Sequence, residues 1–186
     1  MRLVLATLFL VSTSLAAQDT PAAPSTFAFK GFELGSPMAQ AEERENYKCR
    51  EPYAAKALGD KLCHLGRGDS ETIAGRPAQS VTLYYIDDAL GMISVKFDTR
   101  DFRAIAEALA LKYDKPASTE TETLQNAMGA AFESTTMRWT SGDQVMTLTQ
   151  RSRKLTQGDL TITSLPYMKA TDARIAQDAK KRADDL

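Results

Sequence analysis

The sequence predicts an α+β domain in which helices pack on one face of an antiparallel β-sheet. Residues 79–86 and 92–97 each alternate between apolar and polar side chains, as strands with one buried face do. Acidic turn residues separate the two runs, which is typical of a β-hairpin. Apolar residues then recur at helical spacing and form one broad stripe: Phe102, Ile105, Ala106, Leu109 and Tyr113. A sheet and a helix with one apolar face each can bury these faces against one another.

The N-terminus has the pattern of a secretory signal peptide over residues 1–17. Arg2 supplies a positive charge, and the apolar run that follows is too short to span a bilayer as a helix. Small residues favour cleavage after Ala16, with Ala17 as the second choice; an uncleaved anchor or a buried first helix is the alternative. Residues 18–26 then form a flexible leader. This pattern predicts a periplasmic protein, with secretion as the second choice, and no cysteine near the cleavage point offers a lipid anchor.

Residues 27–166 are predicted to form a single domain whose other elements follow from shorter patterns. In its first half we expect a strand at 27–30, a short helix at 38–45 with Ser36 as its N-cap, a segment at 51–66 that is irregular or holds one helical turn, and a strand at 71–74. In its second half Pro116 ends the main helix, and strands follow at 120–125, 132–140, 144–150 and 160–165. Short turns between these strands favour an antiparallel meander. The order suggests two loosely repeated helix–strand halves, 27–97 and 99–165.

Residues 167–186 are predicted to form a charged C-terminal helix. Its weak apolar stripe consists of Ile175, Ala176, Ala179, Ala183 and Leu186. The acidic residues at its end have the wrong sign for a helix C-terminus, so the end should fray. This segment is either a solvated tail or a partner-binding helix.

The two cysteines, Cys49 and Cys63, predict one disulfide, because an exported chain with two cysteines has one possible intramolecular pairing. Closing this short loop would stabilise the fold by roughly 3 kcal/mol. The alternatives are a metal site that uses His64 and a reactive thiol. A metal site would need two further ligands, and the chain has no other histidine.

The sequence favours no enzymatic constellation, metal or cofactor. A serine or cysteine hydrolase needs a base beside its nucleophile, and His64 adjoins a cysteine that a disulfide would consume. Asp87 and Asp88 suit a hairpin turn better than a catalytic or calcium site. The formal net charge of −1 and the lack of a basic tract argue against nucleic acid as a partner. After the leader, no segment is long and apolar enough for a membrane span.

The remaining candidate is a surface, the face of the sheet turned away from the helices. If Trp139, Met146, Leu148, Leu160 and Ile162 face the helices, the other face carries a predicted set of seven side chains. These are Tyr84, Met92, Lys96, Thr147, Thr149, Thr161 and Thr163. They form either plain solvent-facing sheet or a rigid platform on which tyrosine and methionine anchor a partner.

Three segments resemble small exported bacterial proteins of the β-lactamase-inhibitor-like fold, which includes small lipoproteins of outer-membrane assembly. They are Gly31-Phe-Glu-Leu-Gly35-Ser-Pro, Leu109-Ala-Leu-Lys-Tyr-Asp-Lys-Pro116 and the stretch from Trp139 to Leu148. The chain differs from these families in having Asp114 where glycine is usual and in lacking the lipid-attachment cysteine. The resemblance implies a periplasmic binding or accessory module without catalytic residues.

We therefore expect an exported, non-enzymatic protein-binding module, such as an inhibitor, an immunity-type protein or an envelope accessory. Its partner would be another protein of the periplasm or envelope. The alternative is a structural or assembly role at the envelope through the C-terminal helix. A third hypothesis is an enzyme whose carboxylates the sequence does not pair.

Overall fold

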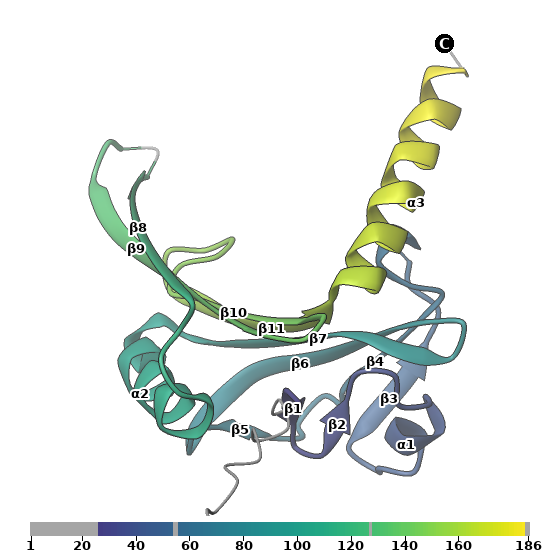
Figure 1. Cartoon of the computed structure of the whole chain (residues 1–186), viewed down its shortest axis with the longest axis horizontal. Helices are drawn as coiled ribbons and strands as arrows, with labels where there is room; N and C mark the ends of the chain where they lie inside the picture. Colours follow the sequence, from purple (N-terminus) through teal and green to yellow (C-terminus); the bar gives the residue numbers. More distant parts are fainter. Residues whose placement is uncertain (1–25, 54–55, 127, 185–186) are drawn as a thin grey trace, which may run out of the picture.

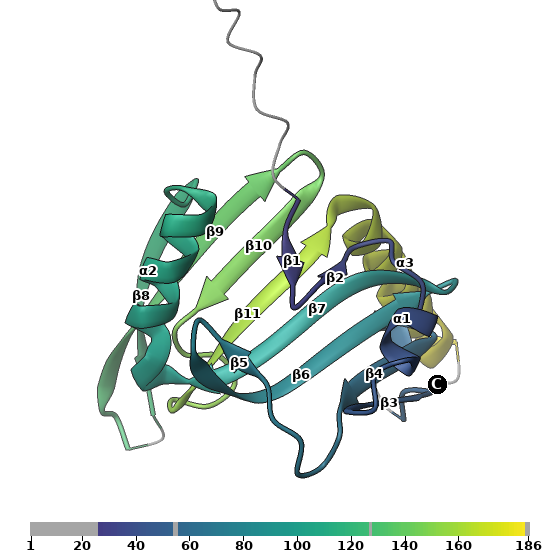
Figure 2. The same ribbon diagram turned by 90° about the horizontal axis from the view of Figure 1, so that it is seen from below.

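Strands from both halves of the chain form one antiparallel sheet in the computed structural model, which describes residues 26–53, 56–126 and 128–184. The strands run in the spatial order β3-β4-β6-β7-β11-β10-β9-β8, and the short β5 pairs with β6 (Figure 2). Their bounds are β3 Tyr47–Arg50, β4 Lys61–Leu65, β5 Thr72–Ile73, β6 Arg76–Ile86, β7 Ala89–Asp98, β8 Ser118–Gln125, β9 Ala131–Ser141, β10 Gln144–Thr149 and β11 Gln157–Ser164.

Each half of the chain forms one half of the sheet, and the two halves join at the centre of the sheet. In the first half α1 (Ala39–Glu42) precedes β3 to β7, and in the second α2 (Phe102–Tyr113) precedes β8 to β11. The last strands of the halves, β7 and β11, pair across the centre, with Ile93 opposite Ile162. This arrangement agrees with the two helix–strand halves expected from the sequence.

One face of the sheet carries the hydrophobic core. The buried side chains on it are those that the alternation predicts, and they include Val81, Leu83, Tyr85, Ile93, Val95, Phe97, Trp139, Met146, Leu148, Leu160 and Ile162. The helix α2, the one-turn helix α1 and the small hairpin of β1 (Ala28–Phe29) and β2 (Phe32–Glu33) lie on this side (Figure 1). We call the other side the open face. The α+β class, with helices packed on one face of an antiparallel sheet, is therefore confirmed.

One strand, β4, lies inside the segment that the sequence predicted as irregular or as one helical turn. Within 51–66, the short helix η1 (Lys56–Leu58) precedes β4, and β3 pairs with β4 so that Cys49 lies directly opposite Cys63. The two cysteines form the predicted disulfide. The irregular assignment was wrong for 61–65 because Lys61–Leu65 has adjacent buried residues, Leu62 and Cys63, in place of a clean alternation.

Neither α1 nor α2 has a side-chain hydrogen bond from its own N-cap residue. The predicted Ser36 cap was wrong: the Ser36 hydroxyl donates to the Glu33 carbonyl, and α1 begins after Met38, whose N–H donates to an Asp88 carboxylate oxygen at 3.2 Å. Before α2, the Asp98 carboxylate accepts the Arg100 N–H in the short helix η2 (Thr99–Asp101). The Arg100 guanidinium and N–H together lower the pKa of Asp98 to about 2.

Asp114, which ends α2, occupies a backbone conformation that suits glycine. Its φ of 66° and ψ of −170° lie in a region that L-residues with a Cβ rarely adopt. Its carbonyl accepts the Trp139 indole N–H at 2.9 Å, which ties the end of α2 to β9.

We expect Asp114→Gly to raise the free energy of unfolding by about 1 kcal/mol, because relief of strain exceeds the added chain entropy of glycine. Urea unfolding would measure the change, and an unchanged or lower midpoint for Asp114→Gly would contradict it.

The C-terminal helix α3 (Leu165–Ala183) begins directly where β11 ends and rises on the side of the open face (Figure 1). Ser164 is its N-cap and accepts the Tyr167 N–H at 3.3 Å. The helix therefore begins two residues before the predicted 167–186 segment, and Leu186 of the predicted stripe lies outside the described residues. Of the helices that the structure describes, none is long and apolar enough to cross a membrane.

Candidate functional site

The structure places all seven predicted surface residues on the open face. Strand register arranges them in rows that cross the sheet. Tyr84 is opposite Met92, which is opposite Thr163, and Thr161 is opposite Thr147. The remaining two lie in the row Lys96, Asp159 and Thr149. The seven side chains therefore share one face of the sheet.

Asp159 lies on this surface between Lys96 and Thr149, and it was not among the residues predicted from the sequence. Its carboxylate accepts a hydrogen bond from the Ser94 hydroxyl at 3.0 Å and another from the Thr161 hydroxyl at 3.0 Å. It lies directly opposite Lys96 in the strand register. The predicted strand begins at residue 160, whereas β11 begins at Gln157. The alternation of Asp159 with Thr161 and Thr163 was the available signal.

Tyr84 is half-buried on the open face, two rows from Asp159 in the strand register. Burial raises the pKa of its phenol, and the negative charge of Asp159 raises it further, while Arg153 acts in the opposite direction. The phenol therefore stays neutral at physiological pH and can both donate and accept a hydrogen bond. Together with Met92, it offers the aromatic and thioether groups that recur in protein interfaces.

Thr163 points to the open face but is buried. It is 8% exposed, and its hydroxyl donates to the Gly91 carbonyl at 3.2 Å. The other six predicted residues of the open face are partly exposed. The accessible part of the predicted surface therefore excludes Thr163.

One side of α3 holds the helix to the body through polar groups. The ring of Tyr167 packs against Gly91, and its hydroxyl donates to the Leu58 carbonyl. Arg174 donates to both carboxylate oxygens of Asp60, at 2.8 and 3.3 Å. These contacts come from η1 and β7, so the first half of the chain positions the C-terminal helix.

A second side of α3 presents apolar groups to solvent. Leu165, Met168 and Ile175 are 46%, 41% and 49% exposed. Their mean direction lies about 105° around the helix axis from the packed side that Tyr167, Thr171 and Arg174 form. An amphipathic helix normally buries its apolar side, and α3 leaves it uncovered beside the open face.

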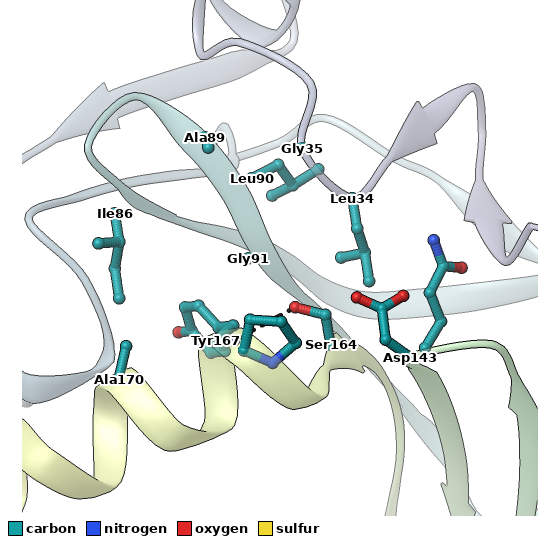
Figure 3. A pocket seen from close by; sticks show the side chains of 12 residues that line it. Leu34, Gly35, Ile86, Ala89, Leu90, Gly91, Asp143, Ser164, Tyr167 and Ala170 are labelled. Atoms are coloured by element: carbon teal, nitrogen blue, oxygen red, sulfur yellow. Dashed lines mark hydrogen bonds between the residues drawn. The ribbon is translucent and has the colours of Figure 1, made fainter.

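A cavity of about 430 Å³ lies at the base of α3, between the helix, the β6–β7 turn and the end of β11 (Figure 3). The polar groups that line it take part in capping the helix: Ser164 accepts the Tyr167 N–H, and the Asp143 carbonyl accepts the Leu165 N–H. Leu34 and Gly35, from the segment after β2, also line the cavity.

The other candidate residues are not brought together as a reactive centre. The disulfide uses Cys49 and Cys63, and a His64 ring nitrogen lies 3.0 Å from the Leu65 carbonyl oxygen. Asp87 and Asp88 form the β6–β7 turn, both with positive φ, as the turn interpretation requires. In the part of the chain that the structure describes, no three His, Cys, Asp or Glu side chains gather in a way that could hold a metal ion.

Acid is expected to loosen the outer part of α3. The hydrogen bond from Arg174 lowers the pKa of Asp60, so the pair stabilises the fold above the ordinary carboxyl pKa of about 4. That stabilisation is lost as the pH falls through the lowered pKa. Because both side chains are partly exposed, the loss should be about 0.5 kcal/mol.

Amide hydrogen exchange of residues 171–178 between pH 6 and 2 would measure this loss, after correction for the intrinsic pH dependence of exchange. Asp60→Asn is the control, because it should remove the pH-dependent part. Equal corrected protection in both proteins at every pH would contradict the assignment.

No protein-family model, no curated protein and no solved structure matches the chain.

Proposed function

We propose that this protein is a non-enzymatic binding module that holds a partner protein against its open face and the exposed side of α3. The observation that carries the proposal is the orientation of α3. The helix is fixed to the body through Tyr167 and Arg174, whereas Leu165, Met168 and Ile175 face solvent. Covering these side chains with a partner would remove apolar surface from water, at about 25 cal/mol per Å².

The open face adds directional contacts to this apolar side. Tyr84 and Met92 are adjacent in one row, and Lys96 and Asp159 are adjacent in another. Asp159 is already held by two hydroxyl donors, which fixes its position before a partner arrives. A preorganised surface loses less side-chain entropy on binding. Protein interfaces commonly have tyrosine and methionine at their core and polar residues around it, and Tyr84 and Met92 with their polar neighbours fit this arrangement.

The proposal includes a place of action, the periplasm, with secretion as the second choice. The disulfide supports an oxidising compartment. The predicted signal peptide and leader, 1–17 and 18–26, lie outside the described residues, apart from Thr26. Under this proposal the partner is another protein of the periplasm or envelope, as the resemblance to β-lactamase-inhibitor-like proteins also implies. The protein would then act as an inhibitor, an immunity-type protein or an envelope accessory.

The test is recovery of a partner from a periplasmic extract of the source organism with the mature protein as bait. Point variants are preferable to deletion of the C-terminal helix, because Tyr167 belongs to the packed body. We expect one dominant partner with the wild type, and its loss with Tyr84→Ser/Met92→Ser and with Ile175→Glu. Leu111→Glu is the matched control, because this side chain is 90% exposed on α2, away from the open face. Recovery of the same partner by all variants would overturn the proposal.

The exposed apolar side of α3 also favours a second candidate, an assembly role at the envelope through this helix alone. In that case a membrane-associated partner would be lost with Met168→Glu and Ile175→Glu, and retained with Tyr84→Ser/Met92→Ser. The two sets of variants therefore separate the candidates.

A further inference from the structure

We propose that the free edge of β8 accepts an extended, basic polypeptide segment as an additional strand. This edge lies apart from α3 and from the seven predicted residues, and its Glu120 continues the open-face row of Lys96, Asp159 and Thr149 through Thr136. The inference comes from the position of β8 in the sheet, the direction of its backbone groups and its charge.

The two edges of the sheet differ in length and exposure. The strand order ends at β3 on one side and at β8 on the other. The strand β3 has 4 residues and is joined to β4 by the disulfide. The strand β8 has 8 residues, and all except Leu124 are exposed. A short edge is protected against strand addition, whereas a long exposed one is a template for it.

The backbone of β8 directs alternate hydrogen-bonding groups away from its neighbour. The Asn126 N–H donates to the Ala130 carbonyl at 3.0 Å, next to the pair Gln125 and Ala131 that begins the β8–β9 register. Alternation in an antiparallel ladder then assigns the even-numbered residues of β8 to hydrogen bonds with β9. On the other side of β9, the Gln150 N–H donates to the Thr135 carbonyl at 2.9 Å, so odd-numbered residues of β9 bond towards β10. The odd-numbered Thr119, Thr121 and Thr123 therefore point their N–H and C=O groups to the free edge.

Part of the β8–β9 hairpin extends beyond the rest of the sheet. The register of β9 with β10 ends at Thr136, opposite Thr149, and hydrogen bonds from Gln150 and Arg151 still reach the carbonyls of Thr135 and Glu133. Beyond these contacts, residues 131 and 132 of β9 pair with β8 alone. Figure 1 shows this hairpin curving up from the sheet. A two-stranded ribbon has little stability of its own, and a third strand on the free edge would stabilise it.

Charge determines which strand fits. Glu120 and Glu122 are exposed and, being two residues apart, share one face of the strand. If two copies of β8 paired antiparallel about Thr121, Glu120 would lie opposite Glu122 of the other copy, and like charges opposite each other are destabilising. Lysine or arginine at the same positions of a partner strand would be favourable. The charge of this edge therefore disfavours pairing of two copies of β8 in this register and favours pairing with a basic strand.

The experiment uses the mature protein and a labelled peptide of alternating lysine and threonine. We expect saturable binding by fluorescence anisotropy and protection of the Thr119, Thr121 and Thr123 amides from hydrogen exchange. A peptide with glutamate in place of lysine should bind at least about tenfold more weakly, as should the Glu120→Lys/Glu122→Lys variant.

Thr121→Pro is the decisive variant, because it removes an outward N–H without removing a β8–β9 hydrogen bond. It should bind the peptide at least about tenfold more weakly, whereas Thr121→Val, which keeps the N–H, should bind like the wild type. Thermal unfolding of both variants checks that the fold is intact. Equal binding by Thr121→Pro and the wild type, or no binding by the wild type, would overturn the proposal. So would a dimer in sedimentation that Thr121→Pro abolishes, because self-pairing would then occupy the edge.

Discussion

Gly91→Ala is expected to expel the ring of Tyr167 and to release the first turn of α3. A Cβ at position 91 would lie 1.9 Å from Cδ2 of Tyr167 and 2.4 Å from Cε2, far inside contact distance. Tyr167 is 7% exposed, so moving it out uncovers a large buried side chain and breaks the hydrogen bond to the Leu58 carbonyl. We expect the free energy of unfolding to fall by about 3 kcal/mol, as for removal of a buried aromatic ring. Urea unfolding would measure it.

A double-mutant cycle identifies the cause. Tyr167→Ala alone should lower the free energy of unfolding by a similar amount, again about 3 kcal/mol. In that background Gly91→Ala should have little further effect, because the new methyl group enters the space that the ring has left. If the two effects add instead, the packing of Tyr167 on Gly91 is not the source of the loss.

Loss of the disulfide is the second large expected effect. Cys49 and Cys63 are 14 residues apart in sequence and lie opposite each other in β3 and β4. Without the bond the unfolded chain regains the entropy of this loop, which corresponds to about 3 kcal/mol. We expect Cys49→Ala/Cys63→Ala to lose at least this much, because Cys63 is fully buried and alanine leaves unfilled space there.

Reduction with dithiothreitol separates the two contributions. The reduced wild type keeps both sulfur atoms, so its loss of stability reports the cross-link alone. The difference between the reduced wild type and the double variant then reports packing at position 63. A urea midpoint that does not change on reduction would contradict the expected role of the disulfide.

The sequence predicted the parts of the fold whose burial follows a regular period. Val81, Leu83 and Tyr85 alternate and are buried, and the stripe from Phe102 along α2 packs on the core. The strands β3 and β4 were missed because they are short and Cys63 lies next to another buried residue, Leu62. Their pairing depends on tertiary contacts and on the disulfide more than on local pattern.

The candidate site was predictable to a similar extent. Alternation placed Tyr84, Met92 and the threonines on one face, but it could not show that the hydroxyl of Thr163 is used internally. The alternation pattern also could not predict how α3 is oriented relative to the sheet. The contacts that do so join residues 109 and 114 positions apart, Tyr167 to Leu58 and Arg174 to Asp60, and no local pattern carries that information.

The meeting of the two halves at the centre of the sheet has a consequence for how the chain folds during its synthesis. The strand that completes the centre, β11, is the last to emerge, although β6 and β7 can form their hairpin as soon as residue 98 is available. Until residue 164 follows, the whole length of β7 remains an unpaired edge with Ile93, Val95 and Phe97 beside it. Such an edge invites pairing with other chains. Chains that stop short of Gln157 should therefore aggregate, and a holding chaperone would be most useful in the interval before β11 docks.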